Sequence, residues 1–239
     1  MLTVAAGHTL AVTFYARWMA SLQKSLGPIS SRLVATNVHD AVLALVESGC
    51  DLLLCYSHSQ FPLELDQTRH ASLLVGRDVL VPVSIPGPGG APVHDLKSRR
   101  ARSVHLVAYS PTSYLGRVTD PVLHGLSKTS SLKFQCITDR SEAVKAMVLE
   151  GFGTGWIPKS MIARDLAEGR LVLAGAERLC VDLQIRIFRS LENRKPMVDR
   201  VWELLNQLTP PGLGARAPDA VDTPARRSAT KFRRLSGGA

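Results

Sequence analysis

The strongest pattern along the chain is an alternation of short apolar runs with amphipathic stretches. The runs place hydrophobic residues at consecutive positions, whereas the stretches between them repeat hydrophobic residues every three or four positions, as on one face of a helix. In the first quarter this predicts strands at Leu2–Ala6, Arg32–Ala35 and Asp51–Tyr56, with helices at His8–Leu26 and from the Asn37 cap to Gly49. Strands that are apolar on both faces and alternate with helices are typical of a parallel sheet covered on both sides.

A second round of the same alternation follows the extended segments Ala71–Val75 and Asp78–Ile85 and a Pro- and Gly-rich segment, 86–102. The expected strands are His105–Tyr109, Leu132–Thr138, Gly155–Pro158, Leu171–Ala174 and the strictly alternating Leu179–Arg189; the expected helices are 112–125, Ser141–Glu150, Lys159–Glu168 and Pro196–Leu208. Two rounds predict two lobes, one formed by 1–83 plus 184–209 and the other by 84–183. Ligands of such sheets bind at the carboxyl ends of strands, beside helix N-termini.

Composition supports a folded α/β chain with a tail. Of the 239 residues, 45% are hydrophobic and 21% are charged, and the formal net charge is +9. Residues 210–239 hold six basic and two acidic side chains among many Pro, Gly and Ala, so we expect a disordered basic tail there. Because about half of the excess charge lies in this tail, and the basic run Lys97–Arg102 lies in a loop, the charge does not indicate a nucleic-acid site on the folded part.

The chain has no apolar run of transmembrane length and no basic N-terminal region of a signal peptide, so we expect a cytoplasmic protein without a membrane partner. Cys50, Cys55, Cys136 and Cys180 lie in or beside apolar runs and form no C-x-x-C pair, which indicates core positions. Cys50 and Cys55 are five positions apart, and a strand would direct them to opposite faces, which argues against a disulfide.

Catalytic motifs are missing from the sequence. It holds no H-E-x-x-H, G-x-S-x-G or phosphate loop, and its histidines do not cluster at metal-ligand spacing. The Gly-rich segment Gly151–Gly155 connects a predicted helix to a predicted strand, whereas dinucleotide motifs need the opposite order. We therefore expect no enzyme, no cofactor and no metal site.

Several segments resemble the effector-binding domain of LysR-type transcriptional regulators. They are LTVAAGHTLAVTFYARWMASL, ATNVHDAVLALVESGCDLLLCYSH, SEAVKAMVLEGFGTGWIPKSMI and EGRLVLAGAERLCVDLQIRIFRS, in an order and spacing that span about residues 1–208. The resemblance implies two Rossmann-like lobes of the type 2 periplasmic-binding-protein fold with a cleft between them. Within the family, VAYSPTSYLGRV and the turn from Thr138 to Glu142 are similar to the hypochlorite-responsive regulators.

The resemblance also implies partners. The family begins with a winged helix-turn-helix that contacts DNA, and this sequence contains none, so we expect DNA binding only through such a domain. Family members pair side by side through the first-lobe helix, here His8–Leu26, which implies a homodimer and a tetramer in the full-length regulator. A small-molecule effector bound between the lobes would shift the arrangement of these subunits.

The candidate ligand-binding residues lie in the turns that lead from strands into helices. They are His8, Thr9, His39, Tyr109, Ser110, Ser113, Tyr114, Thr138, Asp139 and Ser141. Hydroxyl groups and free backbone N–H groups at these turns can bind a polar ligand, but the same side chains can instead cap the helices. A buried Asp139 beside Arg140 would favour a polar, neutral or zwitterionic ligand.

Two other functions remain open on the sequence. A cytoplasmic solute-binding protein could use the same fold, and an oxidant sensor could act through Met or Cys oxidation. Met19, Met147 and Met161 occupy apolar helical positions, which favours a core role. Arg140 stands in the turn where an oxidant sensor would place a methionine.

Overall fold

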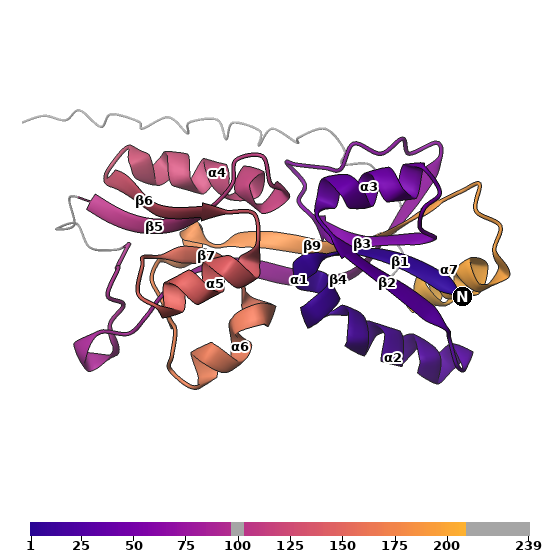
Figure 1. The fold of residues 1–239 in the computed structure, drawn as a ribbon, viewed down its shortest axis with the longest axis horizontal. Coiled ribbons are helices and arrows are strands. Elements are labelled where there is room, and N and C mark those ends of the chain that lie inside the picture. Colours follow the sequence, from indigo (N-terminus) through magenta and orange to yellow (C-terminus); the bar gives the residue numbers. More distant parts are fainter. Residues whose placement is uncertain (97–102, 209–239) are drawn as a thin grey trace, which may run out of the picture.

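The computed structural model describes residues 1–96 and 103–208, which form two lobes (Figure 1). Lobe I contains three parallel strands in the order β2-β1-β3: β1 (Leu2–Gly7), β2 (Ser31–Thr36) and β3 (Leu52–Ser57). Helix α3 (Val38–Val46) lies on one face of this sheet, and α2 (Tyr15–Leu26) and α7 (Pro196–Leu208) lie on the other. Both faces of β3 are therefore covered, which agrees with its continuous apolar run.

Lobe II repeats the arrangement with parallel strands β5 (Ser103–Tyr109) and β6 (Ser131–Thr138). An isolated parallel bridge pairs Leu106 of β5 with Thr154, the residue before strand β7 (Gly155–Pro158). Helix α4 (Tyr114–Ser127) covers one side, and α5 (Ser141–Leu149) and α6 (Lys159–Ala167) cover the other (Figure 1). The remaining elements are the short strand β8 (Val172–Leu173) and the 3-10 turns η1 (Pro88–Gly90) and η2 (Glu177–Leu179).

Two long antiparallel strands, β4 (His70–Ser84) and β9 (Val181–Ser190), connect the lobes. They pair with each other from His70 to Leu80 of β4, while β9 also pairs with β3 in lobe I and the end of β4 pairs with β7 and β8 in lobe II. The sheet of lobe I is therefore mixed rather than purely parallel. The prediction of extended segments at Ala71–Val75 and Asp78–Ile85 is confirmed, and the two are joined into one strand whose register is irregular between Leu74 and Gly76.

The prediction that His8–Leu26 is helical is confirmed, except that the helix is not continuous. The helix is divided at Phe14, whose backbone leaves the helical region (φ −120°, ψ −47°), into α1 (His8–Thr13) and α2. A Cβ atom on Gly76 would lie 3.1 Å from the Phe14 ring and 3.3 Å from Ile185. The ring thus packs over the backbone of β4 where the register changes, at the point where α1 ends and α2 begins.

The cysteines of lobe I are free thiols in a small core beneath α3. Cys50 and Cys55 both belong to a cluster with Ala5, Ala41, Leu45, Leu53 and Phe188. They form no disulfide, as predicted, but the reason given was wrong: Cys50 precedes β3 and packs in the same cluster as Cys55. The predicted tail, 210–239, and the basic run Lys97–Arg102 lie outside the described residues. No described helix is long and apolar enough to cross a membrane.

Candidate ligand-binding site

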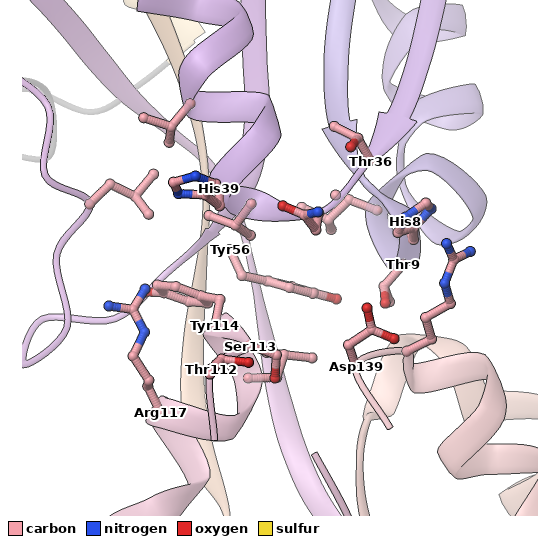
Figure 2. Close-up of a pocket in the computed structure, with 18 of the residues that line it drawn as sticks. His8, Thr9, Thr36, His39, Tyr56, Thr112, Ser113, Tyr114, Arg117 and Asp139 are labelled. Atoms are coloured by element: carbon pink, nitrogen blue, oxygen red, sulfur yellow. The ribbon is translucent and has the colours of Figure 1, made fainter. Parts of the chain in front are cut away.

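A cavity of about 640 Å³ lies between the two lobes (Figure 2). Its wall comes from the starts of α1, α3, α4 and α5, from β3 and from the segment that follows β3. The lining residues are Gly7, His8, Thr9, Leu10, Thr36, Asn37, Val38, His39, Val42, Leu43, Tyr56, Pro62, Leu63, Glu64, Thr112, Ser113, Tyr114, Leu115, Arg117, Asp139, Arg140 and Ser141. The cavity lies where parallel strands end and helices begin, the usual place for ligands of open α/β sheets.

The structure brings most of the predicted site residues to this cavity. His8, Thr9, His39, Ser113, Tyr114, Asp139 and Ser141 are among its lining residues.

Tyr109, Ser110 and Thr138 were also predicted, but they do not line it. The Tyr109 ring is buried in lobe II with its hydroxyl 2.8 Å from Ser141 Oγ, so it supports the wall from behind. Ser110 Oγ lies 2.9 Å from Thr112 Oγ1, and Thr138 Oγ1 accepts from the Arg140 amide at 3.4 Å.

Thr9 offers an open hydroxyl. The alternative that Thr9 caps its own helix is wrong, because Gly7 occupies the N-cap position of α1 and Thr9 lies within the first turn. Thr9 is 7% exposed and lines the cavity, and no side-chain hydrogen bond of Thr9 is found among the described residues. A hydroxyl in this position can form a hydrogen bond with a ligand that enters the cavity.

Ser113, in contrast, is occupied by the helix that it begins. Its hydroxyl accepts from the Gly116 amide at 3.0 Å and donates to the Ser110 carbonyl at 2.8 Å. The first of these bonds is the N-cap of α4, and the second joins Ser113 to the turn before the helix. Asn37 does the same for α3, accepting from the Asp40 amide at 2.9 Å, as predicted for this cap. These caps shape the cavity and leave Ser113 no proton to donate to a ligand.

The N-terminus of α5 differs from those of α3 and α4, because no side chain caps it. Arg140 holds its N-cap position without a side-chain hydrogen bond, and the first turn carries Ser141 and the acidic Glu142. The positive end of the helix dipole at α5 therefore meets the cavity beside the Arg140 guanidinium and the Asp139 carboxylate. This combination can bind a negatively charged group and a positively charged group side by side.

Sequence reasoning missed Tyr56, which forms the middle of the wall (Figure 2). It lies at the carboxyl-terminal end of β3, is 5% exposed, and donates a hydrogen bond of 2.7 Å to Asp78 Oδ2 on β4. Burial, followed by the neighbouring charge of Asp78, raises the pKa of Tyr56 well above its usual value. The sequence feature that could have identified Tyr56 is its polar hydroxyl at the end of an otherwise apolar strand.

The charged residues Glu64 and Arg117 were missed as well. The Arg117 guanidinium lies 5.6 Å from the centre of the Tyr114 ring, close enough for a cation–π contact. Figure 2 shows His39, Tyr114 and Arg117 toward one end of the cavity and His8, Thr9 and Asp139 toward the other, with Tyr56 between them. The apolar residues Val42, Leu43 and Leu63 add to a wall that suits an amphipathic ligand.

Metal-ligating side chains do not gather here: within residues 1–96 and 103–208, no group of three or more His, Cys, Asp or Glu is placed to hold a metal ion.

Known proteins share this fold and sequence pattern. The family model of the LysR substrate binding domain matches residues 1–209. The chain is 27% identical over 206 residues to the HTH domain-truncated transcriptional regulator QseD of Escherichia coli O157:H7, covering 86% of this chain and 80% of that protein. It is 26% identical over 206 residues to the HTH-type transcriptional regulator YjiE of Escherichia coli K12, covering 86% of this chain but only 64% of that protein.

Among solved structures, the apo regulatory domain of HypT from Salmonella typhimurium has a TM-score of 0.72 at 23% identity, covering 87% of this chain and 94% of that one. This likeness shows the fold, the two-lobed α/β architecture of periplasmic-binding proteins that was expected. The relatives named above are transcriptional regulators. The match of the family model over residues 1–209, which include all of the described residues, shows that the chain belongs to the LysR substrate-binding domain family.

Proposed function

We propose that this chain is the effector-sensing domain of a LysR-type transcriptional regulator, and that a small ligand in the inter-lobe cavity sets the arrangement of the lobes. The observation that carries the proposal is the origin of the cavity wall: Thr9, His39 and Tyr56 come from lobe I, and Asp139 and Ser141 from lobe II. A ligand that contacts both lobes binds one inter-lobe arrangement better than another and therefore shifts the population between them.

The cavity favours an amphipathic ligand with a carboxylate or a zwitterionic group. Its polar group would lie at the end formed by Thr9, Arg140 and Ser141, and its apolar body along Val42 and Leu63. A cavity of about 640 Å³ is within the size range of sites for small organic ligands.

A homodimer is the second part of the proposal. Strand β6 is an edge of the lobe II sheet and exposes Phe134 at 50% and Ile137 at 56%, and the lobe I edge strand β2 exposes Leu33 at 37%. Exposed apolar edges of this kind are covered in stable proteins. A second copy in antiparallel orientation would place elements of lobe I against β6 of its partner. DNA would be contacted through an N-terminal domain of a full-length regulator in the bacterial cytoplasm.

The burial of cysteine and methionine side chains supports ligand binding over the alternative of oxidant sensing. Burial raises the pKa of the Cys50 thiol to about 11 and that of Cys55 still further, so both stay in the less reactive thiol form. Met19 is buried in the core, and Arg140 rather than a methionine lines the cavity. We therefore propose ligand binding, not oxidation, as the signal, and leave the hypochlorite-responsive subgroup as the competing hypothesis.

A thermal-shift screen of aromatic carboxylates, aliphatic acids, amino acids and hypochlorite tests the proposal. Ligands that raise the melting temperature of the wild type should lose most of that effect in Thr9→Val, which removes the open hydroxyl. Thr119→Val is the matched control, because Thr119 is buried in α4 outside the cavity and, within residues 1–96 and 103–208, its hydroxyl bonds only to carbonyls of its own helix. Ligands that stabilise Thr9→Val as strongly as Thr119→Val would show that they bind elsewhere.

A further inference from the structure

The proton of the Tyr56 hydroxyl is committed to the protein interior. The Asp78 carboxylate receives four hydrogen bonds: Oδ2 accepts from the Tyr56 hydroxyl at 2.7 Å and from Ser160 Oγ at 2.6 Å, and Oδ1 accepts from the amides of Val79 at 2.8 Å and Ser160 at 3.2 Å. A carboxylate has only acceptor sites, so each of these partners acts as donor. The group is 8% exposed and joins β3, β4 and α6.

The consequence for the cavity follows from the chemistry of a phenol. A phenol has one proton to donate, and burial together with the charge of Asp78 keeps that proton on Tyr56. Toward a ligand, the Tyr56 oxygen can therefore offer only a lone pair. Figure 2 shows the hydroxyl end of Tyr56 directed toward the side of the cavity where Thr9 and Asp139 lie.

The neighbouring polar groups also act as hydrogen-bond acceptors toward the cavity. Ser113 gives its proton to the Ser110 carbonyl, and Tyr114 gives its proton to the Phe61 carbonyl at 2.8 Å. Asp139 adds a carboxylate to the wall next to Tyr56. The wall on both sides of Tyr56 is thus rich in acceptors, whereas Thr9, Arg140 and the first turn of α5 supply donors at the polar end, where Arg140 offsets the charge of Asp139.

From this distribution we infer that the effector is a small carboxylic acid that also carries a hydrogen-bond donor, a hydroxyl or amino group, and that Tyr56 is the residue that selects for the donor. The acid group binds among the donors of the polar end, and the second group donates to the Tyr56 oxygen. An acid without a donor leaves this oxygen desolvated and unpaired, which costs binding free energy. The inference rests on the proposed function and narrows its ligand class.

The test measures dissociation constants for pairs of acids that differ in one group, using hydroxybenzoates against the corresponding fluorobenzoates and hydroxyhexanoate against fluorohexanoate. Fluorine is similar in size to a hydroxyl but has no proton to donate. In the wild type, at least one hydroxy acid should bind roughly fivefold or more tightly than its fluoro counterpart. In Tyr56→Phe this ratio should fall to about one.

Two variants control for indirect effects. Ser160→Ala removes a different donor from Asp78 and does not touch the cavity, and Tyr15→Phe removes a buried hydroxyl that bonds to Ser31 Oγ at 2.9 Å, away from the cavity. Both should keep the hydroxy-to-fluoro ratio of the wild type.

Equal binding of hydroxy and fluoro acids to the wild type, or an unchanged ratio in Tyr56→Phe, overturns the inference and leaves the sensing function intact. If Ser160→Ala also loses the preference for hydroxy over fluoro acids, that preference depends on the position of the Asp78 carboxylate, and the role of Tyr56 is overturned. Failure of every acid to bind overturns the proposed ligand class and this inference together.

Discussion

Replacing Asp78 by asparagine removes half of the acceptor capacity from a buried cluster that joins both lobes. The amide keeps the shape of the carboxylate but exchanges one oxygen for an NH2 group. If nitrogen takes the place of Oδ2, the hydroxyls of Tyr56 and Ser160 lose their acceptor; if it takes the place of Oδ1, two backbone amides lose theirs. Each unmet buried donor costs about 1–3 kcal/mol, and hydroxyls recover part of this by rotating, so we expect a loss of about 3 kcal/mol.

Urea unfolding followed by circular dichroism measures this loss. Asp182→Asn on β9 is the matched control, since Asp182 is exposed and its substitution should change the free energy of unfolding by less than about 0.5 kcal/mol. A double-mutant cycle with Tyr56→Phe should give a coupling of about 1 kcal/mol, because the phenylalanine removes one of the donors that the amide cannot satisfy. If Asp78→Asn is as stable as Asp182→Asn, the hydrogen-bond cluster does not stabilise the junction of the lobes.

Three other outcomes follow from local geometry. Gly76→Val should lower the free energy of unfolding by about 2 kcal/mol, because the new side chain would meet the Phe14 ring. Adding Phe14→Ala to this variant should recover part of the loss. If urea unfolding shows that the losses of the two substitutions simply add, the packing of Phe14 over Gly76 is contradicted. Burial lowers the pKa of His58 below its usual value of 6.5, so the folded state binds a proton less readily than the unfolded state. The melting temperature should therefore fall as the pH drops below about 6.5, and His58→Gln should fall less steeply; parallel profiles would exclude His58 as a cause. Phe134→Glu on the exposed edge of β6 should convert a homodimer into a monomer in light scattering at micromolar concentration, and a monomeric wild type would refute the dimer itself.

Much of the architecture could be predicted because local patterns carry it. The run Leu52–Tyr56 is buried on both faces in the structure, and the strict alternation at 181–187 forms β9. The turns after β1, β2 and β6 were predicted as ligand contacts since residues at strand ends face the edge of a sheet where ligands bind. Thr9, His39 and Asp139 indeed lie at the cavity.

What the sequence could not decide were the choices between equivalent local roles. Ser113 and Thr9 both stand at helix starts, and either could cap or bind; the structure makes Ser113 a cap and leaves the hydroxyl of Thr9 open. The difference depends on where the helix begins within one or two residues, which propensities do not determine. Likewise, the break between α1 and α2 occurs at Phe14, whose ring packs over Gly76 of β4, and the helical periodicity around Phe14 gives no sign of this contact with a distant strand.

The sequence by itself therefore predicted the order of most strands and helices and the ends of the strands at which the cavity lies, because these follow from periodicity over neighbouring residues. The family was indicated separately, by the resemblance of four segments to the LysR-type effector-binding domain. Only the tertiary structure decided the hydrogen-bond polarity of the cavity. Tyr56 meets Asp78 across 22 positions, and Asp78 meets Ser160 across 82. Whether a hydroxyl donates to or accepts from a ligand is set by the partner that takes its proton, and that partner is brought into place only when distant strands and a helix pack together.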